Sequence, residues 1–275
     1  MEKKAFDFLK IYELPKKPRK KGITEIRVPY YAATPTMTYI ADLLDSWSDY
    51  FDGMKFACGT QRLIDSGKVR KIIRLCHEHD VYVSTGGFVE RVLVQGKQSV
   101  DRYFKECKGL GFDVIEISSG FVNVSIEDRL AMVKKVSDMG MKPKPEVSMM
   151  LGAGAGTHIV GYKTRMKSME EFFSEAKAYI DSGAEIIMVE SEGLTEDLPP
   201  KKWRLDVIRK LIRKFGHERW MFEAADPEVF KWYYKNVGRE ANLFIDHTQV
   251  VEFNAWRLGL WGDQKIWGNK RYAYR

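Results

Sequence analysis

The chain has 275 residues, of which 44% are hydrophobic, 30% are charged and 13% are aromatic, and its net charge is +7. This length and balance are typical of one (β/α)8 barrel or of two small globular domains, and they exclude a disordered chain and a miniprotein. No uninterrupted apolar stretch reaches the roughly 18 residues of a membrane span, so we expect no membrane contact. The three cysteines form no CxxC pair. Since the N-terminus also lacks a secretory signal pattern, we expect a cytoplasmic protein.

The positive charge is concentrated at the two ends of the chain. Residues 1–21 carry eight Lys or Arg against three Asp or Glu, and residues 263–275 carry four against one, which leaves −1 for the rest. A basic terminal segment is more typical of a solvated tail or a subunit contact than of a nucleic-acid-binding arm. We therefore predict a basic N-terminal extension over residues 1–21, a basic C-terminal tail over residues 263–275, and no nucleic-acid partner.

Short β-branched or apolar runs alternate with longer amphipathic segments between these two ends. The predicted strands are residues 23–28, 51–56, 81–84, 114–118, 141–147, 185–189, 220–222 and 243–245. The predicted helices include residues 62–79, 100–110, 125–139, 168–182, 205–215 and 227–236. Eight βα units predict an α/β protein, a single-domain (β/α)8 TIM barrel over residues 22–262. An open doubly wound sheet is the alternative, but no Gly-rich phosphate fingerprint follows the first strand.

Carboxylates stand at the ends of five successive predicted strands. Because chemistry in a barrel lies at the carboxyl ends of the strands, these side chains are expected to meet at one mouth. Any one of these carboxylates is as readily explained by a structural role as by a functional one. Five carboxylates at one mouth, however, repel one another unless cations or protons compensate their charge. Oxygen ligands favour Mg2+ over zinc. The carboxylates are Glu116, Glu146, Glu190, Glu223 and Asp246, and the first four are our candidate metal ligands.

Basic residues are expected to compensate this charge from the barrel interior. Lys142, Lys144 and Glu146 alternate with Pro143, Pro145 and Val147, and strand residues two apart share one face. The pattern therefore predicts that Lys142 and Lys144 point into the barrel together with Glu146. The alternative is an extended surface segment held open by the two prolines.

Arg27 and Lys55 each lie one step from the end of a predicted strand, so we expect both at the mouth. Schiff-base chemistry at Lys55 is compatible with this position but is not required by it. His247 beside Asp246 is the histidine best placed for acid–base work, unless it caps the helix that follows. Cys58 has no adjoining histidine and is not expected to be a nucleophile.

A glycine-rich stretch, Gly152 to Gly156, follows the fifth predicted strand. It lacks the Lys-Ser/Thr ending of a P-loop, so a mobile lid is favoured over a phosphate cradle. Closure of such a lid would bring His158 and Lys163 toward the strand ends. Trp261 and Trp267 are expected in packing or subunit contacts.

Motifs along the chain resemble the phosphosulfolactate synthase family. They are Lys55-Phe56 with Gly59-Thr60, Ile64-Asp65 with Gly67, Thr85-Gly86-Gly87, Glu116-Ile117-Ser118, Lys144-Pro145-Glu146-Val147, Glu190-Ser191-Glu192-Gly193, Phe222-Glu223-Ala224-Ala225-Asp226-Pro227, Asn242 to Gln249, Gly259-Leu260-Trp261-Gly262 and Ile266-Trp267-Gly268. The resemblance implies a (β/α)8 barrel and a homo-oligomer, such as a trimer. It also implies Mg2+-dependent addition of sulfite to phosphoenolpyruvate, giving (2R)-phosphosulfolactate on the route to coenzyme M.

Combined with this resemblance, the residue pattern suggests a role for each candidate residue. Lys144 is the candidate acid that protonates C2, His247 is the second, and Lys55 also belongs to the catalytic group. The candidate substrate-binding residues are Arg27, Lys142, Ser118, Ser191, Gly193, His158 and Lys163.

Some positions depart from the family pattern and leave the substrate open. They are Ala57, Cys58, Ser119 and the Gly152 to Gly156 stretch. A related lyase with another nucleophile or another phosphorylated enol acid is one alternative. Because the family includes plant heat-stress-associated proteins, a non-enzymatic barrel protein is the other.

Overall fold

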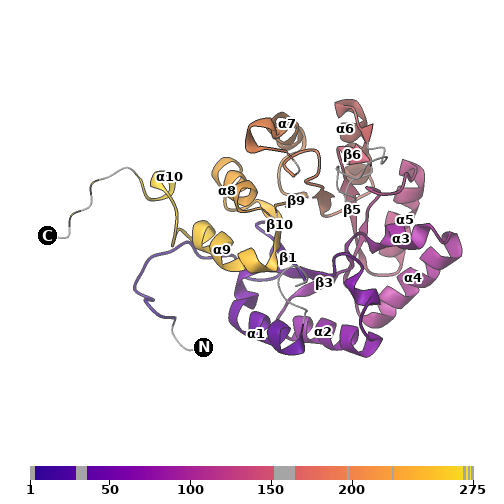
Figure 1. The fold of residues 1–275 in the computed structure, drawn as a ribbon, viewed down its shortest axis with the longest axis horizontal. Coiled ribbons are helices and arrows are strands. Elements are labelled where there is room, and N and C mark those ends of the chain that lie inside the picture. The colour runs from indigo at the N-terminus through magenta and orange to yellow at the C-terminus, as the bar shows by residue number, and fades with distance from the viewer. Residues whose placement is uncertain are drawn as a thin grey trace.

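Eight parallel strands close into a barrel in the computed structural model, which describes residues 4–28, 36–151, 165–196, 198–224, 226–268, 271 and 273. The strand order is β1-β10-β9-β8-β5-β4-β3-β2, so β1 pairs with β10 and closes the sheet. This arrangement, drawn in Figure 1, confirms the predicted single-domain (β/α)8 barrel. The strands are β1 (Thr24–Arg27), β2 (Gly53–Lys55), β3 (Tyr82–Ser84), β4 (Val114–Ile117), β5 (Lys142–Val147), β8 (Ile187–Val189), β9 (Trp220–Glu223) and β10 (Asn242–Asp246). A separate two-stranded antiparallel sheet pairs β6 (Met150–Leu151) with β7 (Arg165–Met166).

Helices surround the barrel on its outside (Figure 1). The helices are α1 (Met37–Trp47), α2 (Ser66–Glu78), α3 (Val89–Leu93), α4 (Lys97–Leu110), α5 (Ile126–Asp138), α6 (Met169–Asp181), α7 (Leu205–Phe215), α8 (Pro227–Asn236), α9 (Val250–Leu258) and α10 (Gln264–Trp267). Short 3-10 turns are η1 (Ser48–Tyr50), η2 (Thr60–Arg62), η3 (Gly86–Phe88), η4 (Pro200–Lys202) and η5 (His247–Gln249). None of the described helices is both long enough and apolar enough to span a membrane.

Local signals explain why several helices begin where they do. Ser168 and Glu171 form a capping box at the start of α6, and Pro227 occupies the first turn of α8, where its missing N–H costs nothing. The predicted helices 205–215 and 227–236 match α7 and α8 to the residue. Residues 36–48 and 249–259, for which no helix had been predicted, contain α1 and α9.

The amino-terminal half of the barrel interior is filled by apolar side chains. Ile23, Met188, Met221 and Phe244 form one cluster, against which Tyr82 packs. Gly53 on the neighbouring strand gives the Tyr82 ring its space, since a Cβ at that position would lie 2.2 Å from a ring atom. This packed layer closes the barrel below, so only the carboxyl-terminal mouth can receive a ligand.

The second half of the N-terminal extension is held against the closed end of the barrel. Arg19 pairs with the buried carboxylate of Asp52 at 2.9 Å, and the other oxygen of Asp52 accepts the Thr24 N–H at 2.8 Å. Arg257 is buried here and donates to the Thr24 hydroxyl at 2.9 Å, and burial lowers the pKa of its guanidinium to about 10. The Tyr12 N–H donates to the Leu258 carbonyl at 3.2 Å. Residues 12–21 are therefore built into the fold.

Candidate functional site

The carboxyl-terminal half of the barrel interior is lined by ionisable side chains. Five carboxylates and three cations project inward from β1, β2, β4, β5, β9 and the end of β8, and we refer to them as the charged cluster. All of them except the partly buried Glu190 are buried. The cluster consists of Glu25, Arg27, Lys55, Glu116, Lys144, Glu146, Glu190 and Glu223.

Lys144 is fully enclosed within the charged cluster. Its ammonium contacts Glu25 closely, lies 3.1 Å from Glu116 Oε2 and lies 3.5 Å from the Ser84 hydroxyl. The Lys144 ammonium and Glu116 Oε2 therefore form a buried ion pair. The charged partners of Lys144 are both carboxylates.

Lys55 shares Glu116 with Lys144 from the other side. Lys55 Nζ lies 3.0 Å from Glu116 Oε1. Burial alone raises the pKa of the Glu116 carboxyl, but the charges of Lys55 and Lys144 outweigh it, so the net shift is downward. Burial by itself lowers the pKa of the Lys55 ammonium, but the negative charges of the surrounding carboxylates raise it by more. The net shift is upward, so this ammonium stays protonated.

Two cations at the mouth rest on one aromatic ring. Arg27 Nη2 lies 2.8 Å from Glu223 Oε1, and the Arg27 guanidinium carbon lies 5.1 Å from the centre of the Phe244 ring. Lys55 Nζ lies 4.1 Å from the same ring centre. A ring face attracts cations without neutralising them, so Phe244, which belongs to the packed layer below, supports positive charge at the floor of the mouth.

Glu146 and Glu190 are the carboxylates of the cluster for which no ion pair with a described residue is found. Burial raises the pKa of each well above its usual range, and neighbouring carboxylates raise it further: mainly Glu116 for Glu146, and Glu223 for Glu190. Five carboxylates against three cations leave a surplus of negative charge. Protons on these two groups or a bound cation must balance that surplus.

Three carboxylates come close enough together to hold such a cation. One oxygen each from Glu190, Glu196 and Glu223 lies within 4.8 Å of the other two. The Ser191 N–H donates to Glu190 at 2.8 Å, and the Ser191 hydroxyl contacts Glu196, so this residue orients two of the three acids. A donor set made only of carboxylate oxygens suits Mg2+.

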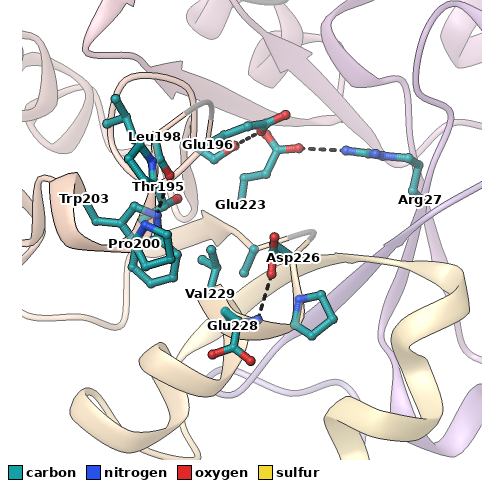
Figure 2. Close-up of a pocket in the computed structure, with 14 residues that line it drawn as sticks. Arg27, Thr195, Glu196, Leu198, Pro200, Trp203, Glu223, Asp226, Glu228 and Val229 are labelled. Carbon is teal, nitrogen blue, oxygen red and sulfur yellow. Dashed lines mark hydrogen bonds and ion pairs between the residues drawn. The ribbon is translucent and has the colours of Figure 1, made fainter.

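A cavity of about 520 Å3 opens beside these carboxylates. Its walls include Trp203 from the β8–α7 connection and Asp226 with Val229 from the start of α8. Figure 2 shows the Glu223 carboxylate between Glu196 and Arg27 at the edge of this space. The volume suits a small ligand.

Comparison with known proteins assigns the chain to a family. The model of the (2R)-phospho-3-sulfolactate synthase (ComA) family matches residues 12–263. The chain belongs to this family. It is 30% identical over 254 residues to the protein HEAT-STRESS-ASSOCIATED 32 of Arabidopsis thaliana, covering 88% of each chain. It is 26% identical over 234 residues to phosphosulfolactate synthase of Methanocaldococcus jannaschii, covering 82% of this chain and 88% of the relative.

Solved structures share the fold with this ComA-family chain. KGPDC from Streptococcus mutans superposes with a TM-score of 0.54 at 12% identity, covering 89% of this chain and 98% of the other. N-acetylneuraminate lyase from Mycoplasma synoviae gives 0.51 at 14% identity, covering 85% and 73%. At these identities the likeness shows the barrel alone.

The structure brings most of the predicted site residues of this family member together. Arg27, Lys55, Lys144 and all four predicted metal ligands lie in the charged cluster, and Ser191 adjoins it. Ser118 is buried at the end of β4, with its hydroxyl 3.4 Å from the Gly87 carbonyl oxygen. Gly193 is buried and has a φ of +75°, which a side chain would strain.

Lys142 does not lie at the site. Its side chain is exposed at the opposite end of the barrel and pairs with Glu185 at 3.0 Å. Lys142 does share one face of the strand with Lys144, as the alternation of side chains predicts. Two residues along a strand are, however, separated by about 6.6 Å, so the two lysines lie at different depths in the barrel. Lys142 therefore emerges below the packed layer, whereas Lys144 and Glu146 lie above it.

His247 is buried at the end of β10, and its ring meets Tyr39 edge-on with the ring centres 5.7 Å apart. Neither ring nitrogen has a hydrogen-bond partner among the described residues, although Nδ1 lies 3.2 Å from Asp246 Oδ1. The cap of the following turn is Asp246, which accepts from Thr248 N–H at 2.9 Å. Burial raises the pKa of the Asp246 carboxyl, but the adjacent His247 ring and the hydrogen bonds from Thr248 outweigh burial and lower this pKa to about 2. The candidates His158, Lys163 and the Gly152–Gly156 lid lie outside the described residues.

Three functional residues were not predicted from the sequence. Glu25 lies two residues before Arg27 and therefore shares its face of the strand, so the alternation of side chains along a strand could have predicted it. Glu196 lies in the connection after β8, where no periodic signal exists. Glu90 on α3 is buried and accepts the N–H groups of Gly120, Phe121 and Val122 at 3.1, 2.7 and 2.9 Å, which fixes the connection after β4.

Proposed function

We propose that this protein is a phosphosulfolactate synthase-like lyase that adds sulfite to phosphoenolpyruvate in a Mg2+-dependent reaction. The product would be (2R)-phosphosulfolactate, and the reaction would take place in the cytoplasm on a route to coenzyme M. Family membership supports the reaction class. The observation that carries the proposal is the charged cluster, because a barrel without chemistry gains nothing from burying five carboxylates and three cations at its mouth.

Both substrates are anions and need positive charge in a site with surplus carboxylates. Arg27 and Lys55 face the mouth over Phe244 and would hold the phosphoenolpyruvate carboxylate or phosphate. Glu190, Glu196 and Glu223 would hold Mg2+. When bound, the metal would supply positive charge that stabilises the electron-rich intermediate.

The reaction proceeds by addition and then protonation. The sulfite sulfur forms a bond to C3 of phosphoenolpyruvate, and the electron pair of the C2–C3 double bond moves through C2 onto the carboxylate. Arg27 and Lys55 stabilise this enediolate-like charge. A proton from the Lys144 ammonium then reaches C2, and Lys144 recovers a proton from water. The phosphate ester stays intact throughout.

A second candidate is a non-enzymatic stress protein that keeps the barrel. The identity of 30% to HEAT-STRESS-ASSOCIATED 32 favours it. A protein without a reaction has no need for the charged cluster. Replacing a buried ion pair by apolar residues is often neutral or stabilising, so an unused site would be free to lose it.

A direct assay distinguishes the two candidates. The protein is incubated with phosphoenolpyruvate, sulfite and Mg2+, and the reaction is followed by loss of the enol absorbance and by a new phosphorus resonance. We expect product with Mg2+ and none with EDTA. Glu196→Gln should lower Mg2+ affinity, whereas the exposed Glu106→Gln should not. Absence of product with all three components would overturn the synthase proposal, and full turnover in EDTA would overturn the metal site alone.

A further inference from the structure

The cavity beside Glu223 has walls of two kinds. Its inner end, at Arg27 and Glu223, is polar and belongs to the rim of the charged cluster. In Figure 2 Trp203 lies on the side of the cavity formed by the β8–α7 connection, and Val229 lies on the side formed by α8. The remaining apolar lining joins these two side chains. We refer to this set as the apolar wall: Leu198, Pro199, Pro200, Trp203, Ala224 and Val229.

Hydrogen bonds within the chain fix the apolar wall in place. The Trp203 indole N–H donates to the Leu198 carbonyl at 3.1 Å, and the Trp203 backbone N–H donates to the Pro200 carbonyl at 3.4 Å. The polar atom of the indole is thereby satisfied, so the ring offers apolar surface to the cavity. Ala224 and Val229 are buried against the barrel. Because the wall is already ordered, little entropy is lost when a ligand lies on it.

Sulfite makes no use of the apolar wall, because it carries no hydrocarbon group. Phosphoenolpyruvate has only its C3 methylene. Burying hydrocarbon the size of a leucine or phenylalanine side chain strengthens binding roughly 10- to 100-fold. An apolar wall next to the polar end of a cavity therefore favours a ligand that combines an anionic head with a hydrocarbon substituent.

The place of the cavity favours the second reactant as the carrier of this substituent. Arg27 and Lys55 would hold phosphoenolpyruvate over Phe244, at the floor of the mouth. The cavity opens to one side of Arg27, next to Glu223. A nucleophile that attacks C3 of the held phosphoenolpyruvate from this side has its sulfur at the polar end of the cavity and its substituent along the apolar wall.

Charge at the outer end of the cavity favours an uncharged substituent. The Asp226 carboxylate accepts the Glu228 N–H at 2.8 Å and caps α8, and the N–H groups of Val229 and Phe230 donate to the Asp226 carbonyl at 3.0 and 3.1 Å. The first turn of α8 therefore has acceptors of its own, and its carboxylate would repel a second anionic group. Among the described residues that line the cavity, the single cation is Arg27 at the inner end.

We propose that the second substrate is an organic sulfinate, R–SO2−, whose head binds beside Arg27 and whose hydrocarbon group R lies on the apolar wall, which rests on the proposed lyase reaction taking place. The sulfur lone pair forms the bond to C3, and the C2–C3 electron pair moves through C2 onto the carboxylate. Lys144 then protonates C2. No bond to sulfur breaks and no oxidant or reductant takes part, so the product is a sulfone that keeps the phosphate ester.

The first test compares nucleophiles in the presence of phosphoenolpyruvate and Mg2+. Sulfite, methanesulfinate and benzenesulfinate are supplied one at a time, and each product is identified by its phosphorus resonance and its mass. We expect the KM of benzenesulfinate to be about 10- to 100-fold below that of methanesulfinate, since only the phenyl group is large enough to cover the apolar wall.

The outcomes separate this proposal from the proposed function. Turnover of sulfite but not of benzenesulfinate overturns the sulfinate proposal and leaves sulfite addition intact. Turnover of benzenesulfinate but not of sulfite supports the sulfinate and overturns sulfite as the substrate. No turnover with any of the three overturns both. Equal KM values for the two sulfinates overturn the role of the apolar wall.

The second test removes the largest side chain of the apolar wall. Trp203→Ala should reduce the ratio of the methanesulfinate KM to the benzenesulfinate KM about tenfold, and Trp203→Phe should restore most of it. Trp261→Ala, which alters a side chain that is 63% exposed beyond α9, should keep the wild-type ratio. Thermal melts show that the variants remain folded. A wild-type ratio in folded Trp203→Ala overturns the contact between the substituent and the indole.

The third test uses the wild type to find the direction of the ring. The added carboxylate of 4-carboxybenzenesulfinate would lie near Asp226, so its KM should be about tenfold above that of benzenesulfinate, and the difference should shrink at high salt. Asp226→Asn keeps a cap for α8 and should narrow the difference. Equal KM values for these two sulfinates in the wild type would show that the ring does not extend toward α8 and would overturn its placement on the apolar wall.

Discussion

Lys142 and Lys144 belong to one strand and point to the same side of it, yet their surroundings are opposite. Lys142 is exposed and pairs with an exposed glutamate, whereas Lys144 is buried between Glu25 and Glu116. The difference is depth along the strand, and it makes the two lysines a matched pair for testing function.

Lys144→Ala is expected to lower the turnover of sulfite addition by about 100- to 10,000-fold, the usual contribution of an acid–base group. Lys142→Ala should leave turnover close to that of the wild type. Because removing Lys144 leaves the buried Glu25 without its ammonium and leaves Glu116 with Lys55 alone, the variant should also lose about 3–5 kcal/mol of stability. Steady-state rates are therefore compared well below its melting temperature. Near-normal turnover of Lys144→Met would contradict the assignment and point to His247.

Glu146 makes stability depend on pH in an unusual direction. Its pKa in the folded protein is raised well above the ordinary 4.5, so the folded state binds more protons than the unfolded state above that pH. Stability contributed by the protonated form is therefore present at low pH and is lost as the pH rises through the folded pKa.

Glu146→Gln removes this dependence, because the amide does not ionise. In buffer with EDTA, we expect the melting temperature of the variant minus that of the wild type to increase from pH 5 to pH 8. Glu106→Gln on the exposed face of α4 should show a constant difference. The same constant difference for Glu146→Gln would mean that its carboxyl titrates normally.

At the scale of elements, one side chain joins α3 to the connection between β4 and α5. The Glu90 carboxylate accepts three successive backbone N–H groups there. Without it the buried N–H of Gly120 and the part-buried N–H groups of Phe121 and Val122 would lose this acceptor. The position of Ser118 and Glu116 at the mouth depends on that connection.

Glu90→Ala is expected to lower the free energy of unfolding by about 2–4 kcal/mol, because each unsatisfied buried donor costs about 1–3 kcal/mol and water will reach some of them. Urea unfolding measures the change, with exposed Glu106→Ala as the control. Equal unfolding midpoints for the two variants would show that the carboxylate is dispensable.

At the scale of the whole molecule, the basic N-terminal extension meets acidic and carbonyl groups of the barrel. Lys17 Nζ donates to the Asp80 carbonyl at 3.1 Å, and Lys21 pairs with Glu240 at 2.6 Å. The Arg19–Asp52 pair is buried, with side chains 5% and 7% exposed. Part of the positive charge concentrated in the N-terminal extension therefore serves to bind this extension to the barrel.

Arg19→Ala is expected to destabilise the barrel by about 3 kcal/mol, since it leaves the Asp52 carboxylate buried without its cation. Lys20→Ala, one residue on and exposed, should change stability by less than about 0.5 kcal/mol. Chemical denaturation compares them. A loss no larger than that of Lys20→Ala would mean that the extension does not support the barrel.

The sequence by itself determined the barrel and the residues at the strand ends. Eight βα periods and the two-residue alternation are local properties, so Glu116, Glu146, Glu190 and Glu223 could be assigned to the mouth without coordinates. The same alternation, applied to β1, also places Glu25 on the inward face together with Arg27.

Only the tertiary structure decided which charges meet. Whether Lys142 or Lys144 lies above the packed layer depends on the stagger of the closed strands, which no local pattern encodes. Glu90 and Glu196 reach their partners through the paths of connections, and those paths are fixed by packing against the barrel rather than by periodicity. The pairing of Glu116 with two lysines, and the grouping of Glu190 with Glu196 and Glu223, follow from barrel closure because it brings residues far apart in the sequence to one axis.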